Sequence, residues 1–410
     1  MKKVLEISLG VLAAIGGFVD IGDLVFNSEA GATFGYQLIW AVVLGAIGIA
    51  VYAEMCGRVA TVAKRPVFDV IRDRMGFGFG LGTLIASQFV NLLTLAAEVG
   101  GVALVLELLT GFLYRPLVLL ALVILVLAVW VLPFEGIERI FGFGGLLLLA
   151  FTVAALKLGP NWNHFANGLV PHPQHTNEYL IWGYFAVGLL ASTLMPYEVY
   201  FYSSGAVEEG WTPTSELGLN KVTAIVGFGL GAFLSISIMT LMAEYFLPLG
   251  IDPDSLGSVA LAPQANLGVI GLLLVLLGMF FAVGGAAIDA AFAGAYNLAQ
   301  FFGWEWGKYR KASGAPRFTL TWLILFGLAF LIIITGVNPI YVTEFAVVFS
   351  VVAMPLTYLP ILLVARDRGY MGAYANGRLG NILGWAYFAV ILAVAISAVP
   401  LLVLTNLGQG

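Results

Sequence analysis

Two stretches, Asp20-Ile21-Gly22-Asp23 and Ser192-Thr193-Leu194-Met195-Pro196-Tyr197-Glu198, interrupt long apolar runs of the chain. Each stretch puts carboxylates and a helix-breaking residue where a membrane-spanning helix is normally continuous. A charged side chain at bilayer depth costs about 2.5–3.5 kcal/mol even on insertion scales, so an intramembrane acid indicates a functional site. Paired interruptions in the two halves of a long apolar chain are typical of the substrate site of a transporter.

The composition predicts a polytopic membrane protein. Of the 410 residues, 61% are hydrophobic and only 10% are charged, whereas a soluble domain carries about 25% charged residues. The 50 glycines favour close helix packing in lipid, and the single Cys56 excludes an internal disulfide or a thiolate cluster. Phosphate-binding, dinucleotide-binding and zinc-protease motifs are absent from the sequence, so we expect neither an enzyme nor a nucleic-acid-binding protein.

Hydropathy predicts eleven membrane-spanning helices, since each needs about 20 apolar residues. The predicted spans cover residues 5–33, 36–60, 78–109, 116–134, 139–158, 178–206, 220–246, 264–300, 318–337, 342–364 and 380–405. The third and the eighth are long, so we expect them to tilt or to project beyond the bilayer. With the N-terminus inside, 16 of the 18 Lys and Arg residues fall on the cytoplasmic side, leaving only Arg115 and Lys157 outside. The positive-inside rule therefore predicts a cytoplasmic N-terminus and an external C-terminus.

The order of the spans predicts an inverted repeat. Spans one to five and six to ten form two sets, and the first member of each set carries an interruption. Because five is odd, the second set must run in the opposite sense to the first. This is the all-α LeuT-type fold, with broken helices one and six meeting near the midplane of the membrane. We expect one transporter domain over 1–410, with repeats at about 5–158 and 178–364 and an extra span at about 380–405.

The interruption of span six exposes a backbone acceptor. Pro196 has no amide hydrogen, so the carbonyl of Ser192 loses its helical partner. An unsatisfied carbonyl inside the membrane is costly, and a bound cation would satisfy it. Met195 adds a polarisable thioether and Glu198 a carboxylate. The break thus offers three kinds of metal ligand, although a lone proline is often only a kink and a lone methionine only a core residue.

Span one supplies the complementary groups. Gly22 permits an unwound backbone, and Asp20 and Asp23 place two carboxylates three residues apart. Carboxylate and carbonyl oxygens suit Mg, Ca and Mn, and a thioether shifts the preference toward softer transition metals such as Mn and Fe. The two stretches together predict a divalent cation site, with Mn or Mg ahead of Zn or Cu.

Several other polar residues lie within the spans or in their connections. Glu98, in the middle of span three, is the best candidate for a proton or water pathway. Asp289 lies in a run of small residues, where we expect a helix-packing surface with a secondary ion contact as the alternative. Glu54 is expected to pair with Arg58 at helix spacing. All three histidines fall in one outer connection, which we interpret as a solvated loop rather than a metal trap: His164, His172 and His175.

Five short motifs in four places carry a family resemblance. They are Asp20-Ile21-Gly22-Asp23 and Glu29-Ala30-Gly31-Ala32 in span one, Ala97-Glu98-Val99 in span three, Met195-Pro196-Tyr197 in span six, and Met371-Gly372-Ala373-Tyr374-Ala375-Asn376-Gly377-Arg378 after span ten. In this order the chain resembles the Nramp family of divalent metal transporters along nearly its whole length. At these places the family carries Asp-Pro-Gly-Asn, Gln-Ala-Gly-Ala, Ala-Glu-Val, Met-Pro-His and Met-Gly-x-Tyr-Ala-Asn-x-Arg.

The resemblance implies metal ligands at Asp20, Asp23, Met195 and the Ser192 carbonyl, with Glu98 as the span-three glutamate of the family. The chain also departs from the family at positions close to the site. The departures are Ile21 for proline, Asp23 for asparagine, Tyr197 for the histidine linked to the proton route, Glu198 for asparagine, Leu95 for an aspartate, and an apolar residue near Val347 for a polar one. The metal site thus gains up to two carboxylates while the proton relay is depleted, as in the magnesium-transporting branch of the family.

These observations predict a plasma-membrane transporter of a prokaryote that imports Mn²⁺, Mg²⁺ or Fe²⁺ by alternating access with weak or absent proton coupling. One alternative is a proton-coupled Mn²⁺/Fe²⁺ symporter that uses Asp20 and Glu98. Others are an amino-acid or organic-solute transporter on the same fold and a non-transporting receptor. The metal ion is expected as substrate rather than cofactor. The expected partners are this ion, the bilayer and, for the symporter, protons, with no obligate protein partner.

Overall fold

The protein is described by a computed structural model over residues 19–173, 179–213, 216–253 and 255–406, and all regular structure in these ranges is helical. The first half contains α2 (Ile21–Phe34), α3 (Ile39–Ala63), α4 (Val67–Met75), α5 (Phe77–Thr110), α6 (Tyr114–Val131), α7 (Phe134–Gly145), η1 (Leu146–Leu148), α8 (Leu149–Leu158) and α9 (Trp162–Asn167). The second half contains α10 (Tyr179–Ser192), α11 (Pro196–Glu208), α12 (Leu217–Tyr245), η2 (Leu247–Leu249), α13 (Leu256–Phe302), α14 (Pro316–Ile333), α15 (Pro339–Arg366), α16 (Arg368–Met371), η3 (Gly372–Tyr374) and α17 (Arg378–Leu404).

Ten helical segments of the described residues are long and apolar enough to cross a membrane, and they correspond to predicted spans two to eleven. Residues 5–18 of the predicted first span, 5–33, lie outside the described residues, as do Lys2 and Lys3. The remainder of this span forms α2. The long helix at predicted span eight, 264–300, has a kink near its start. Gly268 adopts a left-handed φ of 68°, which separates a short segment from the long helix that follows.

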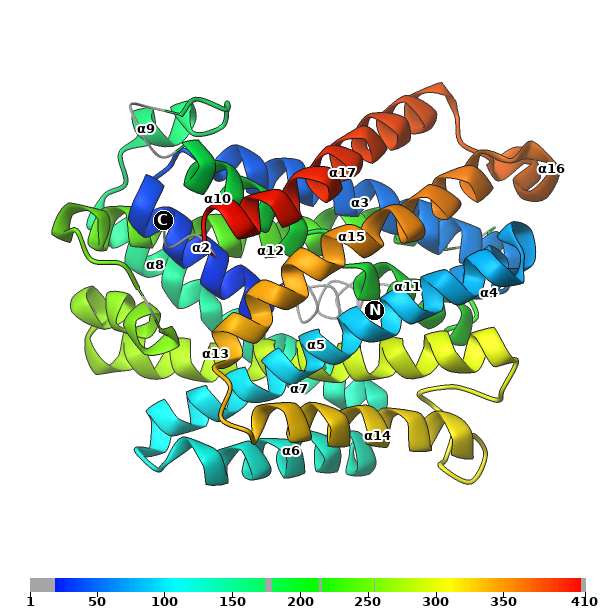
Figure 1. The fold of residues 1–410 in the computed structure, drawn as a ribbon, viewed down its shortest axis with the longest axis horizontal. Coiled ribbons are helices and arrows are strands. Elements are labelled where there is room, and N and C mark those ends of the chain that lie inside the picture. Colours follow the sequence, from blue (N-terminus) through cyan, green and yellow to red (C-terminus); the bar gives the residue numbers. More distant parts are fainter. Residues whose placement is uncertain (1–18, 174–178, 214–215, 254, 407–410) are drawn as a thin grey trace.

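The long helices α5 and α13 pack along each other at the centre of the molecule. α14 and α15 pack on α5, while α6 and α14 lie together along one edge in Figure 1. α17 lies on the opposite side and contacts α10 and α15. This arrangement leaves the short helices α2, α10 and α11 beside longer ones, so the starts of α2 and α11 and the end of α10 are buried within the protein.

α2 is held against α12 by a close backbone approach at Gly31. A Cβ atom built on Gly31 would lie 2.3 Å from the carbonyl oxygen of Met239, so only glycine fits there. Just beyond the end of α2, the Tyr36 hydroxyl donates a hydrogen bond to the Glu244 carboxylate near the end of α12. Small residues at such crossings are how helices pack in lipid.

We expect Gly31→Ala to destabilise the protein by about 1–3 kcal/mol, because the added methyl group meets rigid backbone and forces the two helices apart. The measurement is the midpoint of thermal unfolding in detergent. Gly229→Ala is the matched control, because Gly229 lies in α12 and its added methyl group meets nothing within 4 Å. An unchanged midpoint for Gly31→Ala would contradict the packing described here.

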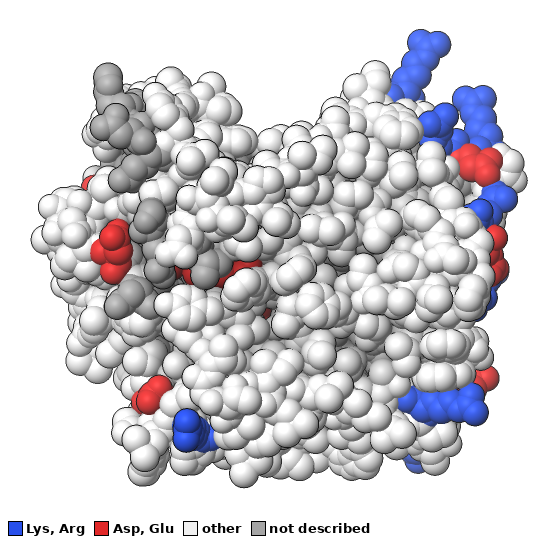
Figure 2. Space-filling view, viewed as in Figure 1, with Lys and Arg blue, Asp and Glu red and all other residues white. Residues whose placement is uncertain are grey.

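The charges divide the molecule into two ends. Figure 2 shows Lys and Arg gathered at the end that carries α4 and α16 in Figure 1. There the Arg72 guanidinium donates to the carbonyl of Gln300 at 3.1 Å, and Arg74 pairs with Asp367 at 2.6 Å. At the opposite end the Lys157 ammonium donates to the carbonyl of Asn266 at 2.6 Å. We call these the Lys/Arg-rich end and the opposite end.

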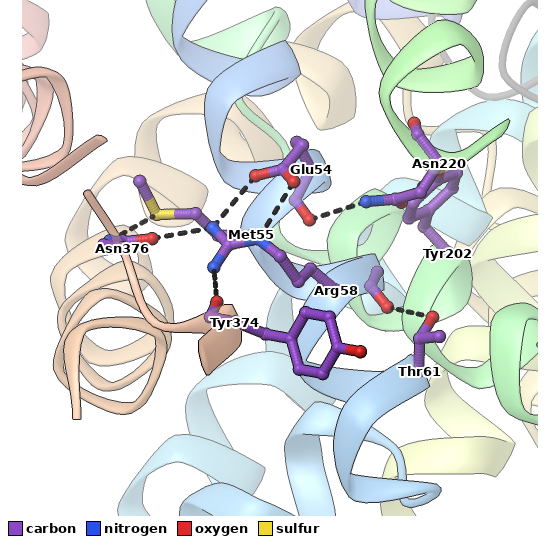
Figure 3. A network of polar contacts seen from close by, with 9 residues as sticks. Glu54, Met55, Arg58, Thr61, Tyr202, Asn220, Tyr374 and Asn376 are labelled. Carbon is purple, nitrogen blue, oxygen red and sulfur yellow. Dashed lines mark hydrogen bonds and ion pairs between the residues drawn. The ribbon is translucent and has the colours of Figure 1, made fainter. Parts of the chain in front are cut away.

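Arg58 organises a polar network at the Lys/Arg-rich end (Figure 3). Its guanidinium donates to both oxygens of Glu54 at 2.9 and 3.0 Å, which confirms the predicted pair. It also donates to the Tyr374 carbonyl at 2.5 Å and to Asn376 Oδ1 at 2.6 Å. The network joins α3 to the segment between α16 and α17, beside a cavity of about 410 Å³. The Tyr-Ala-Asn sequence of this segment therefore has a structural role.

Candidate functional site

α10 ends at Ser192 and α11 begins at Pro196, so the span is broken where the sequence predicts. Proline fits the first position of a helix, because its missing N–H would be unpaired there and its φ is already helical. Met195 before it is extended, with φ −64° and ψ 127°. The Tyr358 hydroxyl of α15 donates to the Leu194 carbonyl at 3.0 Å, so one carbonyl of the break is satisfied from a neighbouring helix.

α2 begins at Ile21 with Asp20 as its N-cap. The Asp20 carboxylate accepts a hydrogen bond from the Asp23 backbone N–H at 2.8 Å, which satisfies one of the free donors of the first turn. The prediction that Gly22 unwinds the backbone was therefore wrong, because Gly22 lies inside the helix. Its Cβ position is 3.0 Å from Asp20 Oδ1 and 3.3 Å from Val347, so Gly22 instead permits close packing.

Three helices meet at the start of α2. The Ser192 hydroxyl at the end of α10 donates to Asp23 Oδ1 at 2.8 Å. Glu98 of α5 accepts a hydrogen bond from the Ile21 backbone N–H at 3.2 Å. The positive end of the α2 dipole therefore faces a group of acidic side chains and partly offsets their charge.

The acids of this region are buried and incompletely paired. Asp20, Asp23, Glu98 and Glu198 are at most 6% exposed. Within the described part of the chain, one carboxylate oxygen each of Asp23, Glu98 and Glu198 has no hydrogen-bond partner. Buried charged oxygens without partners are costly, and a cation between them removes that cost.

The carboxylates alone do not complete a metal site. Among the described residues, no group of three or more His, Cys, Asp or Glu side chains is placed to hold a metal ion. A cation near Asp20 and Asp23 thus needs other donors, and the break supplies the buried Met195 and the Ser192 carbonyl. The buried Glu198 lies close enough for the charges of Asp20 and Asp23 to act on it. Tyr197 is fully buried beside it.

Asp289 lies close enough to the break for its charge to act on Tyr197 and Glu198. It is half-buried in α13, after small residues that pack tightly: a Cβ on Gly284 would lie 2.8 Å from the Phe141 ring. The charged groups that act on Asp289 are Glu138 and Lys308, toward the Lys/Arg-rich end.

The described histidines lie at exposed positions, His164 in α9 and His172 after it, and His175 is outside the described residues.

Glu344 was not singled out from the sequence as a buried acidic residue. This residue lies in α15, one turn before Val347, and is only 5% exposed. Glu29 is half-buried in α2 where the family carries glutamine, and that extra charge was the available signal.

Taken together, the helices define a membrane transporter with three short helices, α2, α10 and α11, that begin or end inside the protein. The chain matches the family model described as natural resistance-associated macrophage protein-like (Nramp) over residues 10–400. It therefore belongs to the Nramp family, whose members are transporters rather than enzymes and take metal as a substrate, not a cofactor.

The comparisons with individual proteins agree with this assignment. The chain is 26% identical to a protein of Deinococcus radiodurans named divalent metal cation transporter MntH, over 94% of this chain and 87% of that protein. It is similar in structure to the Eremococcus coleocola manganese transporter, with a TM-score of 0.76, 19% identity and coverage of 97% and 86%. It is also similar to MhsT, crystallised with L-phenylalanine, with a TM-score of 0.65, 16% identity and coverage of 95% and 98%. The predicted LeuT-type fold is confirmed.

Proposed function

We propose that this protein carries divalent metal cations of the Mn²⁺, Mg²⁺ and Fe²⁺ class across the membrane by alternating access. The proposed ligands are the carboxylates of Asp20 and Asp23, the Met195 thioether and the Ser192 carbonyl, with Glu198 as an added carboxylate. The names of the relatives, divalent metal cation transporter among them, support this class of substrate.

The observation that carries the proposal is the meeting of two buried helix ends. Ser192, the last residue of α10, donates to Asp23 in the first turn of α2, while the second carboxylate oxygen of Asp23 has no partner among the described residues. Pro196 cannot donate to the Ser192 carbonyl. A cluster with more oxygen acceptors than donors suits a hard cation, and its excess of carboxylates favours an ion that keeps part of its hydration shell.

We propose that proton coupling is weak or absent. Tyr197 stands in place of the histidine of the proton route and Leu95 in place of the family aspartate, so two titratable groups of the relay are missing. The acidic residues of the site argue against an organic substrate. A substrate carboxylate would have to lie beside Asp20, Asp23 and Glu198, and like charges at such distances repel.

A proton-coupled symporter is the second candidate, and one contact favours it. Glu98 accepts from the Ile21 N–H, one residue from Asp20, and its other carboxylate oxygen has no partner among the described residues. A proton leaving Asp20 on metal binding could therefore pass to Glu98.

Uptake into liposomes containing the purified protein tests both candidates. We expect an inward Mn²⁺ gradient to drive uptake without acidification of the interior, and Mg²⁺ to compete with Mn²⁺. Glu98→Gln should then retain uptake, whereas the symporter requires internal acidification that this substitution abolishes. A metal indicator and a pH dye inside the same vesicles give both readings.

Uptake of no divalent cation would overturn the proposed function. Amino-acid uptake in its place would establish the organic-solute alternative, and the absence of any flux would favour a receptor.

We also propose that the Lys/Arg-rich end is cytoplasmic, which gives an internal N-terminus and an external C-terminus. The repeats proposed for this single domain are 5–158 and 178–364, with 380–405 added.

A further inference from the structure

A second group of buried acids lies apart from the proposed metal ligands. It is built by α2, α10 and α15, which pack against one another. Each helix contributes one polar side chain: Glu29, Tyr184 and Glu344. Tyr184 and Glu344 are 2% and 5% exposed, and Glu29 is half-buried. Figure 2 shows acidic side chains in a recess near the middle of an otherwise largely uncharged face.

Two of these side chains carry a buried oxygen atom that has no hydrogen-bond partner in the part of the chain that the structure describes. Within the described residues, the Tyr184 hydroxyl and Glu344 Oε2 have no hydrogen-bond partner. The charges that act on Glu29 are those of Glu344 and Asp252, both negative. The charges that act on Tyr184 are those of Glu344 and Glu29. The group therefore concentrates negative charge and oxygen acceptors in a buried place, which is costly unless a cation neutralises it.

The group is separate from the broken-helix site. Glu29 follows Asp23 by six residues of α2, which at 1.5 Å per residue is about 9 Å along the helix. Tyr184 precedes Ser192 by eight residues of α10, or about 12 Å. Both displacements lead toward the opposite end of the molecule, because α2 continues there to Tyr36 and its contact with Glu244. One ion cannot bridge the two groups.

We propose that Glu29, Glu344 and Tyr184 form a second divalent-cation site, at which an entering ion is held before it reaches Asp20 and Asp23. Two carboxylates and a phenol oxygen, without sulfur or nitrogen, suit a hard cation that retains several waters. The identity of the ion as the transported metal rests on the proposed function. Binding at this second site would raise the local ion concentration at the entrance of the pathway.

The test is the number of Mn²⁺ ions bound by the purified full-length protein, measured by equilibrium dialysis. We expect two ions for the unmodified protein, one for Glu344→Gln and one for Asp20→Asn. Glutamine preserves the size of Glu344 and removes its charge. At Mn²⁺ concentrations far below half-saturation, uptake by Glu344→Gln should fall about tenfold, the lower end of what a focused field adds to association rates. Uptake at saturating Mn²⁺ should change little.

Glu107→Gln is the matched control, since Glu107 is a half-buried acid near the end of α5 that leads to the same end of the molecule. It should retain both ions and normal uptake. Two bound ions in Glu344→Gln, or a single ion in the unmodified protein that is lost in Asp20→Asn, would overturn the second site while leaving the proposed function intact. Absence of any binding and any uptake by the unmodified protein would overturn the proposed function itself. Gel filtration shows whether each variant is folded.

Discussion

Replacing Asp20 with asparagine is expected to weaken divalent-cation binding at the broken-helix site by about 100-fold or more. The loss of a residue that merely supports a metal ligand already costs 10–100-fold. Asparagine removes the charge of Asp20 but still accepts the hydrogen bond from the Asp23 N–H, because it is an equally good N-cap. Metal titration by calorimetry measures the loss.

Comparison with Asp20→Ala separates the two tasks of this side chain. Alanine removes the ligand and the cap together, so binding should be lost equally, with an additional loss of about 1 kcal/mol of stability. Asp367 serves as the control, because it caps α16 through Gly369 in the same way at the Lys/Arg-rich end. Asp367→Asn should bind metal normally. Normal metal affinity in Asp20→Asn would exclude Asp20 as a ligand.

Replacing Lys308 with methionine is expected to destabilise the protein by about 3–5 kcal/mol, as for other buried ion pairs that lose one partner. The Lys308 side chain is only 2% exposed and its ammonium lies 3.5 Å from Glu138 and 3.6 Å from Glu209. It also lies 3.7 Å from the centre of the Phe134 ring, a cation–π contact. Methionine would leave the buried Glu138 carboxylate without its counter-ion. Thermal unfolding in detergent measures the loss.

The pH dependence of the stability lost in Lys308→Met follows from the pKa of Lys308. Burial alone would lower the pKa of Lys308, but Glu138 and Glu209 raise it above the ordinary lysine value. When folding raises the pKa of a cationic group, the resulting stabilisation is fully present at pH values below the ordinary pKa, which is about 10.4 for lysine. The stabilisation is lost only as the pH rises through the higher pKa of the folded protein. The difference in midpoint between Lys308→Met and the unmodified protein should therefore stay constant from about pH 6 to 9.

The exposed Lys311 provides the control, since Lys311→Met should not change the midpoint. Adding Glu138→Gln to Lys308→Met should recover part of the lost stability, because the stranded charge is removed. A difference that vanishes near neutral pH would show that Lys308 is uncharged in the folded protein.

The spans could be predicted closely because hydropathy is a property of contiguous sequence. The break before Pro196 was also predictable, since the missing amide hydrogen acts within its own helix. Gly22 was misinterpreted for a related reason. Glycine has two uses, as a breaker and as a close-packing residue, and only the neighbouring Val347 from α15 decides between them.

The burial of Lys308 could not be predicted, because its partners Glu138 and Glu209 come from distant parts of the chain. Positive charge in a connection indicates the cytoplasmic side of a membrane, but it does not show that the side chain turns inward. The grouping of Glu29 with Glu344 could not be predicted for the same reason, since it depends on how α2 and α15 pack against each other. Contacts between residues far apart in the sequence thus determine the features that the sequence pattern could not predict.

The close contact of Gly31 with the Met239 carbonyl also has a mechanical consequence. Together with the Tyr36 hydrogen bond to Glu244, it fixes α2 to α12 at two points, which prevents the helix from sliding or rolling there. The start of α2 is held by polar contacts, which can exchange, and by the packing of Gly22 against Val347. From Gly31 to Asp20 the lever arm is about 16 Å, so a tilt of only ~10° would move the Asp20 carboxylate by about 3 Å. That displacement exceeds the length of a metal–oxygen bond, so a small rotation of this lever is enough to release a coordinated ion.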